Sequence, residues 1–303
     1  MVATGGRNQP AREPHMEHEG LVIRPPSEAD SILLQVTTGC SHNKCTFCGA
    51  YKDKRFRIKS DAEIARDLDF AAQWCTRQRR LFLCDGDALV IPQQRLVPLL
   101  AAIRQRLPWV TRVATYASAK AVALKDDTAL RELREAGLSL AYMGLESGDD
   151  ATLAAVGKKG DSGFIVAQAG RLKAAGFKIN VTVLLGLAGR EGSRRHAAAT
   201  GRALTAMQPE QAAALSLMLI PGTPLHADWE AGRFEQLSPD ELLLELRGIL
   251  EHTDMTGLFF ANHASNYLPV RCRLPRDKAD VLARIDAALA GVVALRPEWS
   301  RRL

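Results

Sequence analysis

Two segments of the chain repeat the same step from a helix into a strand. LREAGLSLAYM begins at Leu133 and LKAAGFKINVT begins at Leu172, and each has a helical pattern, then a glycine, then an apolar run. Gly137 and Gly176 suit the left-handed position that commonly ends a helix. The distance between these glycines fits one strand–helix unit with a somewhat long loop. A repeated unit of this kind predicts an α/β fold with a parallel sheet.

Six apolar or β-branched runs, separated by helical patterns, extend this alternation along the chain. A helix is expected to begin after Ser60, because Ser60 and Glu63 form a capping box and apolar residues follow at helical spacing. Six units in a row predict a partial (β/α)6 barrel, similar to a TIM barrel, with a C-terminal helical extension. The expected strands cover residues 32–37, 81–84, 112–117, 138–143, 178–185 and 213–220.

The expected strands end in polar or glycine-rich residues. Ligands of parallel α/β sheets bind at the carboxyl ends of the strands. These ends therefore predict one shared site, although any single polar loop has an ordinary explanation in its exposure to water. The strand ends are 37–39, Asp85-Gly86-Asp87, Ser118, Glu146-Ser147-Gly148, Gly186 and 221–223.

The pattern changes at both ends of the predicted barrel. Residues 1–29 are rich in Gly, Pro and charge, which predicts a flexible tail. We expect the barrel to cover residues 30–235. Beyond it, Ser238 and Pro239 predict the start of a helix. We expect residues 236–303 to form a helical cap with one short strand, near 258–261, and a last helix from about Pro275.

Composition sets limits on the class of protein. Apolar residues make up 47% and charged residues 24% of the chain, as in an ordinary globular protein. No apolar run approaches the length of a membrane-spanning helix, and the start lacks the apolar core of a secretory signal. We therefore expect a cytoplasmic protein that does not enter a membrane. The net charge of +6 allows an anionic partner such as RNA without requiring one.

Three of the six cysteines lie together, directly after the first expected strand. Cys40, Cys45 and Cys48 have the spacing C-x4-C-x2-C, and in a reducing compartment such thiols are better metal ligands than disulfide partners. Three thiolates would hold a 4Fe-4S cluster with one iron open to a small molecule. A structural zinc needs a fourth ligand, which here could only be His42. The other cysteines lie alone and are expected to be packing residues: Cys75, Cys84 and Cys272.

A basic run, YKDKRFRIK at residues 51–59, follows the cysteines. It could grip a nucleic acid by contacts with phosphates and by stacking on Tyr51 and Phe56. It could equally balance the negative charge of a cluster or dock an electron donor. The third interpretation is an ordinary solvated loop, and the residues alone leave all three open.

Taken together, these features resemble the radical S-adenosylmethionine (radical SAM) superfamily. The resemblance includes the cysteine loop after the first strand and Phe47 before the last cysteine, although the usual cysteine spacing there is three residues, then two. DGD at 85–87 stands where the family often has Gly-Gly-Glu. MGLESGDDATLAAVGKKG from Met143, VTVLLGLAGREGS from Val181 and LSLMLIPGTPLH from Leu215 resemble one subgroup. That subgroup contains oxygen-independent coproporphyrinogen oxidase, the Elongator catalytic subunit and the methylthiotransferases, and the likeness covers about 30–230.

The resemblance implies a function and a set of cofactors. Cys40, Cys45 and Cys48 would hold a 4Fe-4S cluster that cleaves S-adenosyl-L-methionine (SAM) reductively to a 5'-deoxyadenosyl radical. That radical would abstract hydrogen from a substrate, small or macromolecular, whose identity the resemblance does not give. The electron would come from a protein such as flavodoxin or ferredoxin. The residues implied in SAM binding are Asp85, Gly86, Asp87, Ser118, Glu146 and Gly186.

Two further points stay open in the sequence. The alternative to an enzyme is a zinc or iron–sulfur module that binds nucleic acid through residues 51–59, a partner that nothing else in the chain supports. The loop at 262–267 would reach the barrel rim if the strand at 258–261 pairs beside the sixth strand. His263, Asn266 and Tyr267 are therefore candidates for the substrate side, and a lone histidine is equally a hydrogen-bonded core residue.

Overall fold

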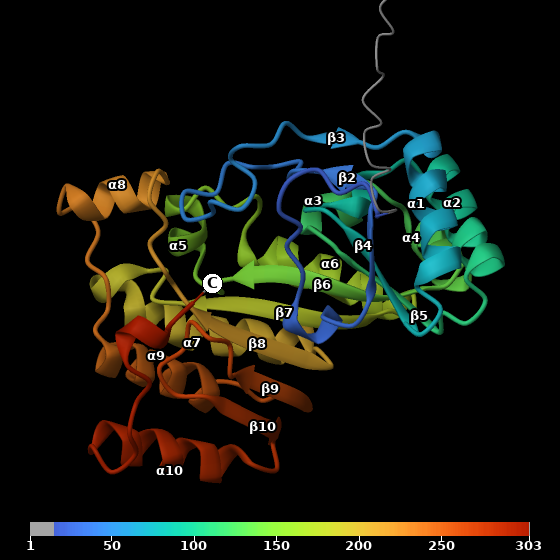
Figure 1. Cartoon of the computed structure of the whole chain (residues 1–303). Coiled ribbons are helices and arrows are strands. Elements are labelled where there is room, and N and C mark those ends of the chain that lie inside the picture. The colour runs from blue at the N-terminus through green and yellow to red at the C-terminus, as the bar shows by residue number, and fades with distance from the viewer. Residues whose placement is uncertain (1–14, 303) are drawn as a thin grey trace, which may run out of the picture.

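The computed structural model describes residues 15–302, and in this part of the chain eight strands form one curved sheet (Figure 1). The strand order is β1-β4-β5-β6-β7-β8-β9-β10, with β1 and β10 at its two edges. All neighbours are parallel except β9 and β10, which are antiparallel. The α/β class and the partial barrel are therefore confirmed. The strands are β1 (Ile32–Gln35), β4 (Arg80–Cys84), β5 (Arg112–Tyr116), β6 (Leu138–Glu146), β7 (Lys178–Leu185), β8 (Gln211–Ser216), β9 (Gly257–Ala261) and β10 (Val270–Leu274).

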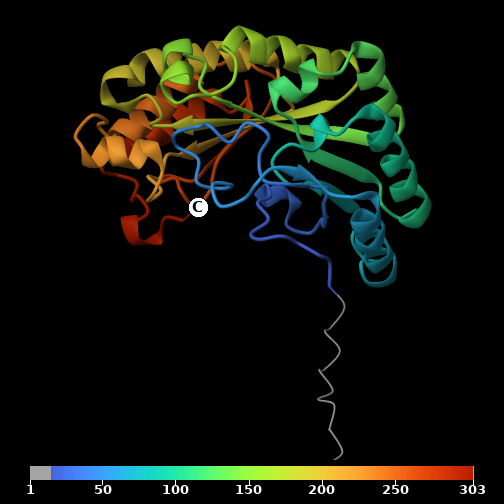
Figure 2. The ribbon, with the colours of Figure 1, turned by 90° about the horizontal axis from the view of Figure 1, so that it is seen from above.

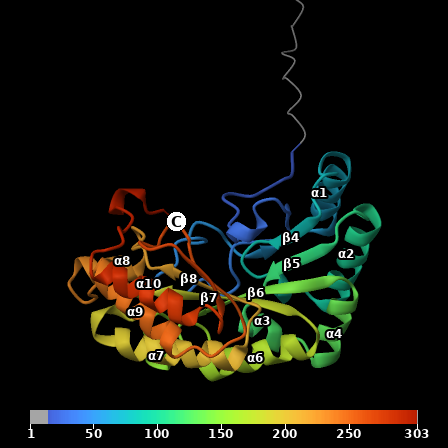
Figure 3. The same cartoon turned by 90° about the horizontal axis from the view of Figure 1, so that it is seen from below.

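The helices lie along one face of the sheet and leave the concave face to the segment before α1, drawn in blue (Figures 2 and 3). Short helices α3, α5 and α8 follow the carboxyl ends of strands, as the connections of a barrel require. The helices are α1 (Asp61–Trp74), α2 (Gln93–Arg106), α3 (Ala119–Ala123), α4 (Asp127–Glu135), α5 (Asp150–Ala155), α6 (Ser162–Ala174), α7 (Gly189–Met207), α8 (Pro224–Glu230), α9 (Pro239–Glu251) and α10 (Lys278–Leu289). Single 3-10 turns are η1 (Pro26–Glu28), η2 (Ala88–Val90) and η3 (Glu298–Ser300).

Local sequence signals explain where several of these elements begin and end. Ser60 and Glu63 form both hydrogen bonds of the expected capping box at the start of α1. Ser238 does the same with Glu241 at the start of α9. Gly137 and Gly176 follow α4 and α6 with φ values of 116° and 88°, in the region that favours glycine. The two repeated helix-to-strand steps are therefore confirmed.

The first expected strand divides after Gln35. Val36 donates to the carbonyl of Cys84, and the chain then pairs in a new direction. The short strand β2 (Thr37–Thr38) runs antiparallel to β3 (Arg57–Ile58), so the segment between them leaves and returns as one loop. This pairing closes the loop that contains the three clustered cysteines.

The apolar core fills both sides of the sheet. Leucine and β-branched side chains from the strands pack against the helices, and Leu34, Leu83 and Val183 are fully buried there. The opposite face carries an aromatic cluster, in which Phe82 packs edge-on against Tyr116, with ring centres 5.0 Å apart. Alternate residues of one strand, such as Phe82 and Leu83, thus face different layers, as the two-residue period of a strand requires.

The expected tail is shorter than predicted, because residues 15–29 contact the barrel. Glu28 is fully buried, where it accepts hydrogen bonds from Tyr142 and Arg112. Met16 packs against the core, and the backbone of Glu17 is bonded to Asp67. A charged, proline-rich composition concealed these contacts, since their partners lie far along the sequence. The part of the predicted tail at 1–14 lies outside the described residues.

The C-terminal region contains two strands rather than the one expected. β9 pairs in parallel with β8, and β10 pairs with β9, so the region continues the barrel sheet. The side chains of β10 alternate between buried and exposed, with Arg271 and Arg273 outward. Helices α9 and α10 cover this edge of the sheet (Figure 3). The boundary predicted at residue 236 stays a prediction.

The isolated cysteines are packing residues, as expected. Cys84 and Cys272 are buried in the core, and Cys75 packs against it at the end of α1. Burial raises the pKa of all three thiols. Within residues 15–302 no helix is both long and apolar enough to cross a membrane.

Candidate functional site

The cysteine loop lies across the carboxyl ends of the parallel strands. Thr46 donates to the carbonyl of Val156 at the end of α5, and its own carbonyl accepts from Leu225 in α8. A Cβ at Gly49 would lie 2.8 Å from Cγ2 of Ile220, so the loop also presses against the segment after β8. Helices α5 and α8 accordingly stand beside the loop (Figure 1). The predicted meeting of strand ends with the cysteines is thus present at this edge of the barrel.

The three thiols of the loop are half-buried and close enough to influence one another. Burial raises the pKa of Cys45 to about 11, and the neighbouring charges of Cys48 and Cys40 raise it further, while Lys158 lowers it. Burial also raises the pKa of Cys48. Cys45 and Cys48 are therefore protonated at neutral pH unless a metal replaces the proton. Three adjacent, partly accessible thiols fit the ligand set of an iron–sulfur cluster.

His42 does not complete a zinc site with these cysteines. Its Nε2 atom is 2.7 Å from the carbonyl oxygen of Gly157, so the ring faces the end of α5. In the part of the chain that the structure describes, no three His, Cys, Asp or Glu side chains converge as ligands of one ion would. A 4Fe-4S cluster binds each thiolate at a separate iron, so its ligands lie farther apart than those of one zinc ion. With its Nε2 atom on the Gly157 carbonyl, His42 leaves the cysteines one ligand short of a structural zinc site.

Asp87 joins three segments at the site. Its Oδ2 atom accepts hydrogen bonds from Ser41 in the cysteine loop, at 2.5 Å, and from Ser118 at the end of β5, at 2.9 Å. Its Oδ1 atom is buried and has no partner. Burial raises the pKa of Asp87, and the two hydroxyls oppose that shift. A buried carboxylate oxygen without a partner is the kind of atom that a bound ligand completes.

Asp85, like Asp87, has one buried carboxylate oxygen without a partner, Oδ1, but its other oxygen has different contacts. Its side chain is fully buried, and its Oδ2 atom accepts from the backbone of Gly39 at 3.2 Å and from Lys54 at 3.1 Å. Tyr51 lies beside it, and burial together with the Asp85 charge raises the pKa of the Tyr51 hydroxyl. Asp85 therefore fixes both ends of the cysteine loop to the end of β4.

Gly86 allows the cysteine loop to approach the strand end. Its backbone N–H donates to the carbonyl of Gly39 at 3.1 Å. A Cβ at this position would lie 3.0 Å from that carbonyl oxygen and 3.1 Å from Cβ of Cys40. Any larger residue would push the first cysteine away, so the absence of a side chain at Gly86 sets the position of the loop.

Glu146 ends β6 in a left-handed conformation, with a φ of 62°. Its Oε1 atom accepts from Lys158 at 2.9 Å, and a Cβ at Gly144 would lie 2.2 Å from that oxygen. The charges of Glu146 and Lys158 both act on Cys45. Lys158 was not among the predicted site residues. Its position after a short acidic helix, in the sequence VGKKG, is the signal that could have identified it.

Gly186 contacts the C-terminal region. Its N–H donates to Glu245 at 2.6 Å, and a Cβ would lie 3.1 Å from Leu242 of the same helix, α9. Its φ of 80° favours glycine. Packing therefore explains this glycine, and a role in cofactor binding stays a prediction.

Most of the basic run at 51–59 is used in internal ion pairs. Lys54 pairs with Asp85, Arg57 with Glu63, and Lys59 with Asp67. Both partners of the last pair are only 1% exposed. Tyr51 is buried, so it is not free to stack on a base. Lys52 and Arg55 are the exposed cations of the run, which leaves little of the surface that a nucleic acid would need.

The loop at 262–267 reaches the end of β8, as expected, but two of its three candidate residues serve the fold. Asn266 is buried, accepts from Ser216 at 2.9 Å and donates to the carbonyl of Ala214 at 2.9 Å. The ring of Tyr267 lies under the guanidinium of Arg301, 4.2 Å from its centre. His263 is partly buried and its Nδ1 atom is 2.9 Å from Ser265 Oγ. Burial lowers the pKa of His263.

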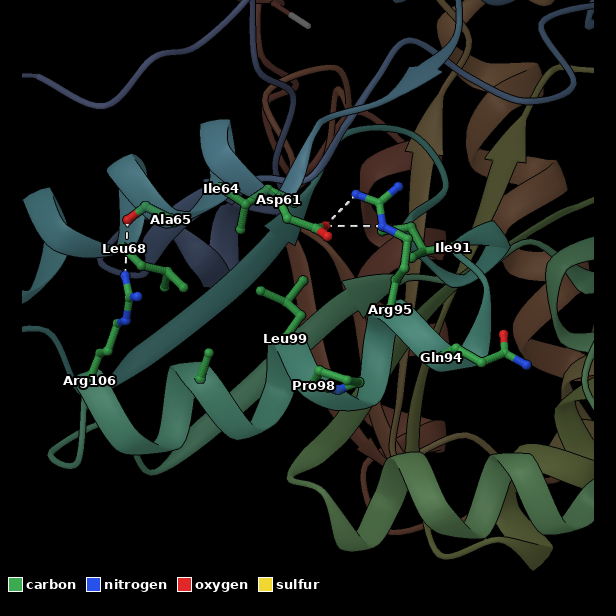
Figure 4. A pocket seen from close by; sticks show the side chains of 11 residues that line it. Asp61, Ile64, Ala65, Leu68, Ile91, Gln94, Arg95, Pro98, Leu99 and Arg106 are labelled. Atoms are coloured by element: carbon green, nitrogen blue, oxygen red, sulfur yellow. Dashed lines mark hydrogen bonds and ion pairs between the residues drawn. The ribbon is translucent and has the colours of Figure 1, made fainter.

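A cavity of about 250 Å³ lies away from the cysteine loop, between α1 and α2. Figure 4 shows apolar side chains on its walls and a bond between Arg95 and Asp61 at one end. Arg106 closes the other end by donating to the carbonyl of Ala65. Both guanidiniums are therefore engaged, and nothing at the cavity resembles the chemistry of the strand ends.

Comparison with known proteins identifies the family. Residues 34–198 match the sequence profile of the radical SAM superfamily. No curated protein sequence matches the chain as a whole or in part. Among solved structures, the coproporphyrinogen III oxidase HemN from Escherichia coli aligns with 84% of the chain and 57% of its own length, at 16% identity and a TM-score of 0.55.

Two further structures show the same fold. The radical SAM methyltransferase TsrM from Kitasatospora setae, with cobalamin and a [4Fe-4S] cluster bound, aligns with 88% of the chain and 54% of its own length, at 17% identity and a TM-score of 0.54. Methylornithine synthase (PylB) aligns with 74% of the chain and 65% of its own length, at 16% identity and a TM-score of 0.52. The chain thus spans between about half and two thirds of the length of these structures. Because the superfamily profile covers more than half of the sequence, the chain belongs to the radical SAM superfamily, whose enzymes use a 4Fe-4S cluster and SAM.

Proposed function

We propose that the chain is a radical SAM enzyme in which Cys40, Cys45 and Cys48 hold the 4Fe-4S cluster. The observation that supports this most directly is the position of three neighbouring thiols on one loop, which lies across the carboxyl ends of the strands. When bound, the cluster supplies one electron that cleaves SAM to methionine and a 5'-deoxyadenosyl radical, which takes hydrogen from the substrate.

The residues around the loop would bind and orient SAM. Asp87 offers a buried, unpartnered carboxylate oxygen to the amino group of SAM, while Ser41 and Ser118 hold its other oxygen. Glu146 and Lys158 present one negative and one positive group beside Cys45. Asp85 and Gly86 would act on the loop rather than on SAM. Gly186 would contribute only through the backbone of the β7 end.

The curved sheet would shield the radical from water. A reactive carbon radical requires a site that excludes other hydrogen donors. Phe82 and Leu140 are part of a buried apolar cluster on the concave face of the sheet, which leaves little room for water there.

The reductant would be an acidic electron-transfer protein such as a flavodoxin or ferredoxin. The enzymes of the superfamily need a reductant. Lys44, Lys52 and Lys159 are exposed, and the carbonyl of Lys44 lies beside Gly157, next to the lysines at the end of α5. Exposed cations near a redox centre attract an acidic partner and speed its association.

One assay tests the central claim. The protein is purified without oxygen, reconstituted with iron and sulfide, and incubated with dithionite and SAM, and 5'-deoxyadenosine is measured by chromatography. We expect its formation in an amount that depends on SAM and on dithionite. A sample with a full cluster that forms none would contradict the proposed activity. Zinc without iron in anaerobic protein would favour the non-enzymatic alternative.

A further inference from the structure

A buried polar network connects the ends of β6 and β7 with the helices behind them. Ser147 follows β6, His196 lies in α7 and Glu245 lies in α9. Ser147 Oγ is 2.7 Å from His196 Nδ1, and His196 Nε2 is 3.4 Å from Glu245 Oε1. The exposed fractions of the three residues are 0%, 0% and 2%. A single histidine thus bridges a strand end and the C-terminal region.

The network contacts two strand ends that we propose bind SAM, the end of β6 through Ser147 and the end of β7 through Glu245. Glu245 Oε1 accepts from the N–H of Gly186 at 2.6 Å, and its Oε2 accepts from Ser193 at 2.5 Å. Ser147 directly follows Glu146, and its Oγ also accepts from the N–H of Asp149 at 2.9 Å. The two strand ends are therefore tied to the same buried pair, His196 and Glu245.

The turn at Glu146 needs such support. A left-handed φ is unfavourable for a residue with a side chain and persists only where the surroundings hold it. Helix α7 presses on the turn, because a Cβ at Gly148 would lie 2.3 Å from the carbonyl oxygen of Ala199, and Thr200 accepts from the Gly148 N–H at 2.9 Å. His196 adds the bond to Ser147, so α7 supports the turn at two consecutive positions, Ser147 and Gly148.

The arrangement is not a nucleophilic triad, although it contains Ser, His and Glu. Ser147 is fully buried, so a substrate has no access to its hydroxyl. The serine also faces Nδ1 of the histidine, whereas in the hydrolase triad it faces Nε2. The network therefore serves geometry rather than covalent chemistry.

Burial determines which of the two groups, His196 or Glu245, carries a proton. Burial raises the pKa of Glu245 to about 7 and lowers the pKa of His196 to about 4. The charged group that acts on His196 is Asp149, which is itself paired with Arg195 at 2.8 Å. The only hydrogen-bonding atom of the His196 ring without a partner is Nε2, which faces Glu245. A protonated Glu245 would donate to it and satisfy both groups.

We propose that His196 and Glu245 are positioning residues that share one proton and hold the Glu146 and Gly186 strand ends in the geometry that binds SAM. This inference rests on the proposed function for its SAM part. Neither residue would touch SAM or the substrate. They would act through Ser147 and through the backbone of Gly186.

The first test uses the protein without its cofactors. Glu245 has a higher pKa in the folded chain than its ordinary value of 4.5, so the folded state binds the extra proton and stability falls as the pH rises from 4.5 to about 7. Glu245→Gln keeps an acceptor for Gly186 and cannot ionise. We expect the melting temperature of the wild type to fall relative to that of E245Q as the pH rises from about 4.5 to about 7. Equal slopes in the two proteins would overturn the shared proton.

The second test measures SAM affinity by calorimetry in anaerobically reconstituted protein. We expect His196→Ala to raise the Kd for SAM about tenfold at unchanged iron content. His196→Asn keeps a polar atom near Ser147 and should recover part of the loss. Ile285→Ala, at a buried position of α10, is the matched control, because it should lower stability without changing the Kd.

The outcomes separate the two proposals. Wild-type affinity in H196A, or an equal loss in I285A, would overturn the positioning role. A wild-type protein that takes up its cluster but does not bind SAM would contradict the proposed function and the SAM part of this inference together. The melting temperatures would still decide whether His196 and Glu245 share a proton.

Discussion

The carboxyl ends of the strands form one edge of the barrel, and the two halves of this edge use their polar groups in different ways. The first half is formed by β4, β5 and β6, and the second by β7 and β8. At β4, β5 and β6, Asp87 keeps a buried oxygen free, and the thiols of the cysteine loop have no covalent partners. At β7 and β8, the C-terminal region occupies the polar groups: Glu245 accepts from Gly186, and Asn266 accepts from Ser216. Buried polar atoms are normally satisfied. The first half therefore keeps a buried polar atom available to a ligand, whereas the polar atoms named in the second half are already paired within the protein.

The largest expected effect comes from the cysteine loop. Cys45→Ala should abolish the iron–sulfur absorbance after reconstitution and lower 5'-deoxyadenosine formation by more than about 100-fold, because two thiolates do not hold the cluster. Iron content and chromatography of the product measure this.

The matched control for the loop is Cys75→Ala. Cys75 is a half-buried thiol that packs at the end of α1, so its loss should leave iron content unchanged. Equal iron in C45A and the wild type would show that Cys45 is not a ligand.

The second prediction concerns the other half of the edge. The guanidinium of Arg301 is nearly fully buried, donates to the carbonyl of Ser265 at 2.7 Å and covers the ring of Tyr267. Arg301→Ala should lower the free energy of unfolding by about 2–3 kcal/mol, because charged hydrogen bonds are lost and a buried carbonyl loses its partner. Urea denaturation measures this change.

Arg302→Ala serves as its control, because Arg302 is exposed. It should change stability by less than about 0.5 kcal/mol. If R301A also lost its capacity to bind the cluster, the separation of the two halves would be wrong.

The sequence was sufficient for the framework of this comparison, and particular residues show why. The alternating elements follow from local patterns, and the capping box at Ser60 and the glycines after α4 and α6 need only a few neighbouring residues. Asp87 and Ser118 were predicted together, since parallel strands bring their carboxyl ends to one edge. What depends on local spacing or on strand direction was thus predictable.

Pairings between distant residues were not predictable in the same way. Lys54 and Lys59 suggested an exposed basic surface, but Asp85 and Asp67 neutralise them from other elements. His196 had no assigned role, because Ser147 and Glu245 are each about 50 residues away in the sequence. The strand β10 did carry a local signal, the alternation of apolar and arginine residues in VRCRL. The prediction of one strand in this region, near 258–261, left that alternation out.

The third prediction tests the free oxygen of Asp87. Burial raises the pKa of Asp87 in the folded state, so the ionised carboxylate lowers the free energy of unfolding. This loss of stability develops as the pH rises from the ordinary pKa of Asp to the folded pKa. Asp87→Asn should therefore raise the free energy of unfolding at pH 7, by about 1 kcal/mol. It should also weaken SAM binding about tenfold, because the carboxylate charge is lost.

Calorimetry and urea denaturation of the same samples measure the two effects of D87N. Asp69→Asn is the control, since Asp69 is an exposed residue paired with Arg106 on the helical face. It should change neither quantity appreciably. If D87N were less stable and bound SAM with unchanged affinity, Asp87 would support the fold and would not bind SAM.

The smallest expected effect concerns the reductant. Lys44→Glu combined with Lys52→Glu should slow reduction by an acidic flavodoxin about threefold at low salt, because two attractive charges become repulsive. Reduction by dithionite, which needs no docking surface, should change little. Lys178→Glu is the control, because Lys178 is exposed at the first residue of β7, at the opposite end of the strands. An equal effect of K178E would show that net charge alone governs the rate, and then the ligand-binding half of the edge would have no part in recognising the electron donor.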